Sequence, residues 1–538
     1  MKMTRLVRHR RNMFVAAVAL AAAFAATAEA QTPIESRWNS FQSDPLRAMN
    51  QIPPKSVKLG KSSKAMTIFS TADVKTGSYI TKKNSARIGT SGAEICDENG
   101  ICLKDILDGR ARAKESVRDF LDARDFVGKK PVLKLEEMEK QNLRDAQLAE
   151  TPWSDNYWPI YQGILGARYA SPNFGSGANW KSFLDLVTKN SQSLKSISEN
   201  GNALAFEVLS PSEKYDLLIG DLTEGRKTYE AGYLTPFMWD EGKAYWDSSG
   251  DVEGWMGICH GWAPASFMVN RPTKSVVTAT ADGKNQLTFY PSDIKGLASY
   301  LWAKAGAPTR FIGGRCNDKE MKTDPETGRP LSEACFDTNP ANWHQIIVNQ
   351  IGVAKRSFVM DATFDYEVWN QPVYSYAYKY FNPQTGREVK KLSTATIPIA
   401  EFTKDKFKKF RSSRTAHVVG ISMDVTYVVE TSPTHNETDA PENDATNTAT
   451  YMYDLELDKN MNIIGGEWYS NAHPDFLWNP VSDGRASSLG DTQITGAWDA
   501  RQPLPKFWRD IAVQTAIRAG LPLAAIVESL IETANTTK

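Results

Sequence analysis

The clearest pattern of apolar and polar positions lies in the C-terminal half, where apolar residues recur at every second position within residues 418–429 and 450–457. A period of two predicts β-strands with one buried face, and we expect these two to be adjacent antiparallel strands of a half-buried sheet. Their apolar faces comprise Ile421, Met423, Val425, Tyr427 and Val429 on the first strand, and Tyr451, Tyr453, Leu455 and Leu457 on the second.

Two shorter apolar runs, Trp343–Val348 and Ser357–Thr363, are also predicted to be strands. A turn over Gln350–Lys355 would make them antiparallel neighbours. That pairing would bring His344, near the start of the first run, close to Asp361 near the end of the second.

Other segments show the three-to-four-residue spacing of amphipathic helices, with charged residues on the opposite face. The mixture predicts an α+β fold with an N-terminal helical subdomain and C-terminal helices. The predicted helical segments are Leu103–Gln147, Trp180–Leu186, the region Pro211–Ala231, Pro291–Ala305, Lys506–Ala519 and Pro522–Thr533.

The N-terminus has the form of an export signal. Basic residues precede an apolar run, Met13–Ala26, and the sequence Ala28-Glu29-Ala30 offers a cleavage site before Gln31. A membrane anchor is the alternative, but the run is shorter than the ~20 residues that span a bilayer. We expect residues 1–30 to be a signal peptide and the mature chain, from Gln31, to be secreted or periplasmic, with no membrane span.

Charge and composition narrow the choice of partners. The formal net charge is zero, and no Lys/Arg-dense tract follows the signal, so neither nucleic acid nor an anionic membrane is an expected partner. The 41% apolar fraction is that of a globular protein. We expect a polar leader and helical subdomain over 31–150, a main domain over 151–480 and a helical extension over 481–538.

The five cysteines are odd in number, which in an exported chain leaves at least one thiol free or intermolecular. Cys96 with Cys102, and Cys316 with Cys335, bracket turn-like segments and form the simplest of fifteen arrangements. This pairing leaves Cys259 free. A buried inert thiol is the alternative interpretation of Cys259.

Cys259 lies in Gly257-Ile258-Cys259-His260-Gly261-Trp262-Ala263. Because proline is tolerated in the first turn of a helix, Pro264 predicts a helix that begins close to Gly261. The sulfur would then lie at the positive end of the helix dipole, which favours a thiolate nucleophile.

A nucleophilic thiol needs a base, and five histidines follow the signal segment. His260 is adjacent to Cys259 and would point away, and His435 lies in the polar loop 432–447, which leaves His344, His417 and His473. We prefer His344 with Asp361 as its orienting acid. His473, which precedes Pro474, is the main rival.

The loop 432–447 is crowded with acidic and polar residues, which predicts a mobile solvated segment. Its carboxylates are of the kind that bind calcium, but their spacing is not that of an EF-hand. These acidic residues are Glu437, Asp439, Glu442 and Asp444.

The order Cys, His, Asp resembles the papain-like transglutaminase superfamily. Three stretches resemble the secreted elicitor-type transglutaminases more closely: residues 257–263, Val368-Trp369-Asn370-Gln371-Pro372-Val373, and Gly465-Gly466-Glu467-Trp468-Tyr469-Ser470-Asn471. In oomycete members the second stretch begins a surface peptide that plant cells perceive. Here Tyr374-Ser375-Tyr376 departs from the expected continuation.

The resemblance implies a papain-like core over 151–480, in which a helix bearing Cys259 packs on an antiparallel sheet bearing His344 and Asp361. It implies a calcium-dependent protein-glutamine γ-glutamyltransferase acting on glutamine and lysine side chains of proteins, with the calcium ligands undefined. By analogy, the Cys259 N–H and one further donor, with Gln162 as a candidate, form the oxyanion hole. A papain-like cysteine peptidase and a non-catalytic secreted binding or elicitor protein are the alternatives.

Overall fold

The structure is a computed structural model that describes residues 123–127 and 131–536, apart from 176, 191, 222–231, 333–334, 336–337 and 471–472. The predicted signal peptide, most of the leader and the predicted Cys96–Cys102 bridge lie outside the described residues. Within those residues, none of the helices combines the length and apolarity needed to cross a membrane.

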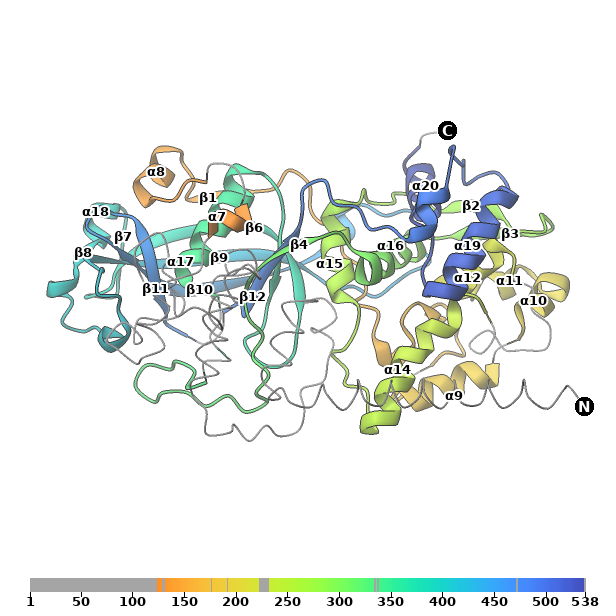
Figure 1. Ribbon diagram of the computed structural model, residues 1–538, viewed down its shortest axis with the longest axis horizontal. Coiled ribbons are helices and arrows are strands. Elements are labelled where there is room, and N and C mark those ends of the chain that lie inside the picture. Colours follow the sequence, from red (N-terminus) through yellow and green to blue (C-terminus); the bar gives the residue numbers. More distant parts are fainter. Residues whose placement is uncertain are drawn as a thin grey trace, which may run out of the picture.

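An antiparallel sheet organises one half of the molecule (Figure 1). Its main path runs β11-β10-β9-β6-β5-β12-β4, with short strands β1 and β7 added to β6, and β8 to β9. The strands are β1 (Asp145–Gln147), β4 (Thr309–Gly313), β5 (Val359–Asp361), β6 (Asn370–Asn382), β7 (Arg387–Val389), β8 (Ile397–Pro398), β9 (His417–Val429), β10 (Ala445–Leu457), β11 (Ile463–Trp468) and β12 (Phe476–Pro480), and a separate hairpin joins β2 (Val276–Ala279) to β3 (Gln286–Phe289).

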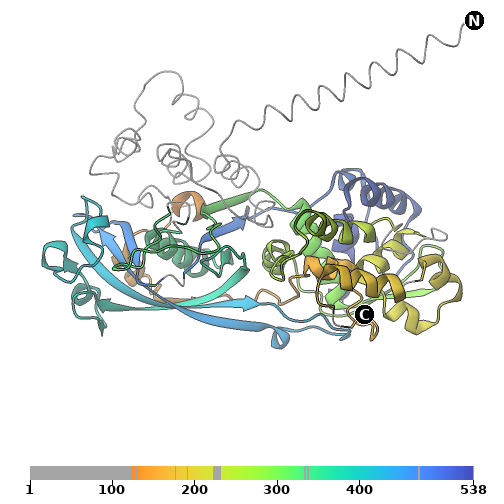
Figure 2. The ribbon, with the colours of Figure 1, turned by 90° about the horizontal axis from the view of Figure 1, so that it is seen from below.

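Most helices gather at the other end, and α15 lies between them and the sheet (Figures 1 and 2). The helices are α7 (Ala123–Val127), α8 (Leu135–Lys140), α9 (Trp180–Asn190), α10 (Leu194–Asn200), α11 (Ala203–Glu207), α12 (Pro211–Ile219), α14 (Thr235–Ser249), α15 (Cys259–Met268), α16 (Pro291–Ala305), α17 (Pro340–Ile347), α18 (Leu392–Ala395), α19 (Lys506–Ala519) and α20 (Ala524–Asn535).

Among the described residues, the buried apolar side chains form two large cores, a smaller one, and a minor cluster of Ile397, Phe402 and Val418. One core joins the helices, including α19 and α20, to the ends of β5 and β12, and the other lies on the sheet beneath α17. The small core packs Cys259 and Trp262 of α15 against Trp153, Trp302 and Val428. The thiol therefore lies where the helical half meets the sheet.

The two alternating strands were predicted correctly. β9 and β10 pair antiparallel over their full length, with Ile421 opposite Tyr453 and Met423 opposite Tyr451. The predicted faces are buried, apart from the half-buried Val429, because a period-two pattern places these side chains on one side of the sheet. Helices were confirmed at 291–305 and 506–519 with the predicted bounds, and at 180–190 and 524–535 with shifted ends.

The prediction of a strand over Trp343–Val348 is wrong. These residues form α17 and the start of a π-helix at Val348–Val353, so the predicted turn at 350–355 is also absent. Asn339 caps the helix by accepting from the Ala341 N–H at 2.8 Å, and Pro340 occupies its first turn. This Asn-Pro start signal outweighs the β-branched run, because a short apolar run does not distinguish a strand from a buried helix.

The segment 432–444 runs back from the sheet to the helical half and is held there by its main chain. The Ser275 N–H donates to the Glu437 carbonyl at 2.7 Å, and the Asp439 N–H donates to the Thr273 carbonyl at 3.0 Å. The last residues of the predicted loop, 445–447, belong to β10. A loop with these contacts is docked on the protein surface instead of extending freely into solvent.

Candidate functional site

Cys259 is the first residue of α15, so the prediction that its sulfur lies at a helix N-terminus is confirmed. The helix begins two residues before Gly261, and Pro264 lies inside it instead of in its first turn. Ile258 precedes the helix and donates its N–H to the Tyr157 carbonyl at 2.7 Å.

The two glycines around Cys259 are required by close backbone approaches. A Cβ on Gly257 would lie 2.5 Å from the Tyr157 carbonyl oxygen, and one on Gly261 would lie 2.1 Å from the Ser299 carbonyl oxygen on α16. Neither position has room for a side chain. The glycines thus allow the thiol to be set between Tyr157 and α16.

The sulfur is 3% exposed and is surrounded by the first residues of β6 and the segment before it. The Asn370 side-chain Nδ2 donates to Sγ at 3.4 Å, the Asn370 main-chain N–H also hydrogen-bonds it, and the Val368 carbonyl lies 3.7 Å away. Burial raises the pKa of the Cys259 thiol to about 12 and outweighs the lowering effect of the Asn370 hydrogen bonds.

Asp361 ends β5 directly opposite Asn370, and opposite residues on paired strands project to the same face. Its Oδ1 accepts from the Trp369 N–H at 2.9 Å and from the Thr363 hydroxyl at 3.0 Å. Its Oδ2 is buried and has no hydrogen-bond partner in the described part of the chain. Burial raises the pKa of Asp361 to about 7, and its charge acts in turn on the pKa of Cys259.

The positive charge of Arg315 lowers the pKa of Asp361, against the larger effect of burial. Its guanidinium is 3% exposed, donates to the Tyr366 carbonyl, and has its pKa lowered by burial to about 10, against the opposing effect of Asp361 and Asp475. The adjacent Cys316 is disulfide-bonded to Cys335, as predicted, with Cα atoms 4.3 Å apart. The bridge thus holds the chain beside Arg315.

The remaining neighbours of the thiol are an acid and aromatic rings. Glu430 accepts from the Gln371 amide at 2.8 Å, and burial raises the pKa of this carboxyl. Its charge acts on Cys259 and on Tyr157, whose ring packs against Trp369 at 5.4 Å. Among charged side chains, the two carboxylates Glu430 and Asp361 therefore have the largest effect on the pKa of the thiol.

His344 does not lie on a strand, as predicted, but in the middle of α17. Its Nδ1 is 2.8 Å from the Tyr453 hydroxyl, its ring packs against Tyr378, and its Nε2 has no hydrogen-bond partner among the described residues. Burial alone lowers its pKa to about 3. His344 therefore forms no hydrogen bond with Cys259 or Asp361, and the predicted Cys–His–Asp chain is not assembled.

The other histidines also have neighbours elsewhere. His260 bonds to the main chain of Ala303 on α16, and His435 stacks on Tyr290 at 4.1 Å. His473 stacks on Trp468 at 4.6 Å, and His417 begins β9. Across the part of the chain that the structure describes, Cys259 forms no hydrogen bond with any of the five histidines after residue 30.

Gln162, the predicted second oxyanion donor, donates a hydrogen bond from its side-chain amide to the Tyr161 hydroxyl at 2.9 Å. The donors at the sulfur come instead from Asn370, which the sequence reasoning did not select. Asn370 lies in the hexapeptide Val368–Val373, which was noted for its resemblance to a perceived surface peptide. In this structure Val368 is 2% exposed and Asn370 fully buried, so the hexapeptide forms part of the thiol site and not an exposed epitope.

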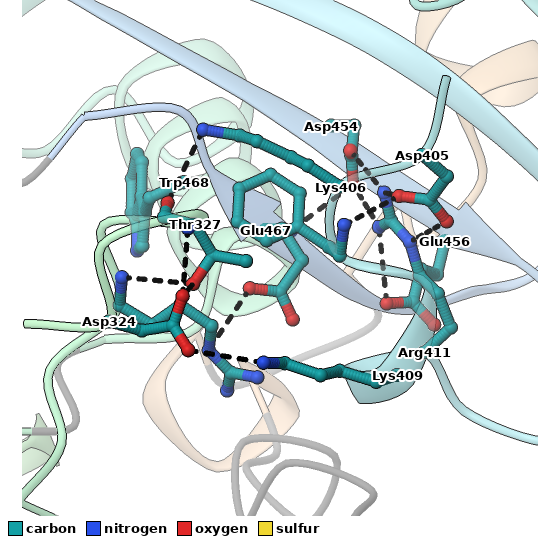
Figure 3. Close-up of polar contacts among 12 residues, drawn as sticks. Asp324, Thr327, Asp405, Lys406, Lys409, Arg411, Asp454, Glu456, Glu467 and Trp468 are labelled. Carbon is teal, nitrogen blue, oxygen red and sulfur yellow. Dashed lines mark hydrogen bonds and ion pairs between the residues drawn. The ribbon is translucent and has the colours of Figure 1, made fainter.

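A second buried polar cluster surrounds Arg411 on the sheet half (Figure 3). Arg411 donates to Asp405 at 3.0 Å, to Asp454 at 2.5 Å and to Glu456 at 3.4 Å. Beside it a cavity of about 260 Å³ is lined by Arg329, Lys406, Glu467 and His473, among other residues. Of these residues, only His473 was considered a candidate site residue from the sequence, as the rival of His344.

Fold and site together define an α+β protein in which a helix N-terminus presents a thiol to an antiparallel sheet. Residues 242–497 match the family described as transglutaminase elicitor, which confirms the predicted resemblance. Among solved structures, the chain is similar to the GP42 transglutaminase from Phytophthora sojae, at 19% identity and a TM-score of 0.43, over 76% of this chain and 97% of that chain. No curated protein matches.

Proposed function

We propose that the protein is a protein-glutamine γ-glutamyltransferase that uses Cys259 as its nucleophile. The observation that carries the proposal is the buried cluster of Cys259, Asn370 and Asp361, inside the segment that matches the transglutaminase elicitor family. A thiol at a helix N-terminus, with hydrogen-bond donors and an ionisable carboxyl beside it, suits acyl transfer.

In the first half-reaction the Cys259 thiol gives its proton to the Asp361 carboxylate, and Sγ attacks the carbonyl carbon of a glutamine side chain. The tetrahedral intermediate collapses, its C–N bond breaks, and the protonated Asp361 returns the proton to the leaving nitrogen, which departs as ammonia. In the second half-reaction a lysine amine attacks the thioester, loses a proton to Asp361 and releases the thiol; water in its place gives deamidation.

This scheme assigns the proton transfers to Asp361 in place of His344. Two observations support it: Asp361 keeps Oδ2 without a hydrogen-bond partner, and its raised pKa of about 7 suits a group that both accepts and returns a proton near neutral pH. His344 instead hydrogen-bonds Tyr453.

The thiol's pKa of about 12 lies well above that of Asp361, so in the described state the proton stays on sulfur. Each unit of this difference in pKa adds ~1.4 kcal/mol to the free energy of transferring the proton from the thiol to the carboxylate. The arrangement is therefore a resting state, and substrate binding has to lower the gap by supplying new contacts to the sulfur.

Calcium dependence stays a prediction from the family resemblance. The acidic loop does not fit a cation, because Asp439 and Asp444 pair with Arg271, and Asp439 also pairs with Lys295 at 2.7 Å. Glu437 and Glu442 are exposed. No step of the proposed mechanism involves calcium.

We further propose that the protein is exported, because the first 30 residues have the form of a cleavable signal. The Cys316–Cys335 disulfide supports an oxidising compartment. N-terminal sequencing of protein recovered outside the cytoplasm is expected to begin at Gln31, and an N-terminus that retains the apolar run would contradict export with cleavage.

A second candidate is a non-catalytic binding protein of the same family, in which Cys259 only fills the core. The observation that favours it is the 3% exposure of the thiol in a site where no imidazole hydrogen-bonds it. The two candidates differ in whether Cys259 reacts.

The test incubates the exported protein with a glutamine-bearing protein and a labelled primary amine, with calcium and with a chelator. Wild type is compared with Cys259→Ala and with Ser266→Ala, a matched truncation of a buried side chain on the same helix. We expect amine incorporation by wild type and Ser266→Ala, and none by Cys259→Ala.

Three other outcomes would assign a different function. Cleavage of the donor without amine incorporation would indicate a cysteine peptidase. Ammonia release without incorporation would indicate a deamidase. No incorporation, ammonia release or cleavage by any of the three proteins would favour the non-catalytic candidate.

A further inference from the structure

Asn370 begins β6 opposite Asp361 and is fully buried, yet it makes polar contacts on both sides of its amide. Nδ2 lies 3.4 Å from the Cys259 sulfur, and Oδ1 accepts from the Trp478 indole Nε1 at 2.8 Å. The residue is thus placed between the reacting atom and a second buried side chain.

The contact with Trp478 determines which end of the amide faces the sulfur. An indole N–H can only donate, so the amide atom beside it has to be the oxygen, and the NH₂ group has to point to Cys259. Trp478 is itself 1% exposed, and its strand β12 pairs with β5 and β4, opposite Val359 and Phe311. The indole has little freedom to move.

We propose that Asn370 is a catalytic residue of the Cys259 site, whose side-chain and main-chain N–H groups stabilise the negative charge that develops on sulfur and then on the substrate oxygen, and that Trp478 is its positioning residue. The proposal rests on the acyl transfer proposed above.

The physical reason is that N–H groups fixed in advance cost no reorganisation when charge appears. The side-chain NH₂ group and the main-chain N–H of Asn370 both hydrogen-bond the Cys259 sulfur. Both lower the pKa of the thiol, against the effect of burial. A flipped amide would instead present Oδ1 to the sulfur, and an oxygen lone pair repels a thiolate. Trp478 prevents that flip by holding Oδ1.

The test uses the full chain and four variants. Asn370→Asp keeps the shape but replaces the NH₂ group with an oxygen, and Asn370→Ala removes the amide. Trp478→Phe removes the indole N–H and keeps a ring. Trp343→Phe is the matched control, because Trp343 is equally buried and its Nε1 has no hydrogen-bond partner in the described structure.

The first readout is independent of any enzyme activity: the rate at which iodoacetamide alkylates Cys259 at a fixed pH, followed by mass spectrometry of its peptide. We expect alkylation at least tenfold slower in Asn370→Asp and a few-fold slower in Trp478→Phe, because a smaller fraction of the thiol is ionised. Trp343→Phe is expected to react at the wild-type rate. Thermal unfolding verifies that each variant is folded.

The second readout is amine incorporation. Removing one such donor elsewhere costs about 10²- to 10³-fold in kcat, so we expect a loss of that size for Asn370→Ala with KM changed by less than about threefold. Folded Asn370→Asp that is alkylated at the wild-type rate would overturn the role of Asn370, and unchanged Trp478→Phe would overturn that of Trp478. If wild type shows no Cys259-dependent amine incorporation, the proposed function is overturned. The alkylation rates would still test the effect of Asn370 and Trp478 on the thiol.

Discussion

The sheet buries polar side chains in two regions, and they differ in how completely the carboxylate oxygens are hydrogen-bonded. Around Arg411, one guanidinium contacts three carboxylates, and Glu456 also accepts from the Ser412 N–H at 3.0 Å (Figure 3). Around Cys259, the Asp361 Oδ2 has no hydrogen-bond partner among the described residues, and the Tyr366 carbonyl accepts a hydrogen bond from Arg315.

The difference separates a structural cluster from a reactive one. Buried charges that are fully hydrogen-bonded fix a conformation, and they are costly to break. A buried carboxyl with a remaining lone pair and a pKa near neutral, next to a thiol, keeps the capacity to move a proton. Asp361 and Glu456 both have pKa values raised by burial to about 7, so contacts and not pKa distinguish them.

The largest effect is expected at the thiol. Cys259→Ala removes the nucleophile, so amine incorporation should fall by roughly 10³-fold or more, while the variant unfolds within a few degrees of wild type. Initial rates and thermal unfolding measure the two. A Cys259→Ala protein that keeps even a tenth of the activity would place the chemistry elsewhere.

In the Arg411 cluster the large effect should be on stability. Arg411→Met leaves Asp405, Asp454 and Glu456 without their guanidinium, which should reduce the free energy of unfolding by about 3–5 kcal/mol. The control Arg485→Met breaks an exposed pair with Glu528 and should cost less than about 1 kcal/mol. Urea unfolding measures both, and a lower activity per folded Arg411→Met molecule would contradict a purely structural role.

Removing the Cys316–Cys335 disulfide perturbs the region that contains Arg315. The main-chain N–H of Cys316, the residue after Arg315, donates to the Asp475 carboxylate at 3.0 Å. Replacing both Cys316 and Cys335 by Ala should cost about 2–4 kcal/mol, because the bridge closes a loop of 19 residues. If the bridge also keeps Arg315 near Asp361, Cys259 alkylation should change in this variant and stay constant in Arg485→Met.

The pH dependence of stability gives a smaller effect. The folded pKa of Asp361, about 7, lies above its ordinary value of 3.8, so the native state binds the extra proton between these values. Its contribution to stability is present below pH 3.8 and is lost as the pH rises through 7. Asp361→Asn should therefore be more stable than wild type at pH 8, on the order of 1–4 kcal/mol, and equally stable near pH 4. The reverse order in urea unfolding would contradict the assignment.

The sequence predicted what depends on local pattern. The alternation in β9 and β10, the N-terminal position of Cys259 on α15 and the Cys316–Cys335 bridge follow from spacing and turn residues that act over a few positions. Asp361 was also placed correctly on a strand.

What depends on tertiary contact was missed. The run Ile346-Ile347-Val348 reads as a strand until Asn339-Pro340 is recognised as a helix start, and this error moved His344 into the predicted triad. Asn370 contacts the sulfur, and Trp478 contacts Asn370, between segments more than a hundred residues apart, for which the sequence has no local signal.

The most direct test of the central claim compares the rates of amine incorporation by Asp361→Asn and His344→Asn, both of which leave an amide in place of the titratable group. We expect a loss of at least about 100-fold for Asp361→Asn, with faster alkylation of Cys259 because a negative charge near the thiol is gone, and a change below about threefold for folded His344→Asn. A folded His344→Asn that is inactive, beside an active Asp361→Asn, would contradict it.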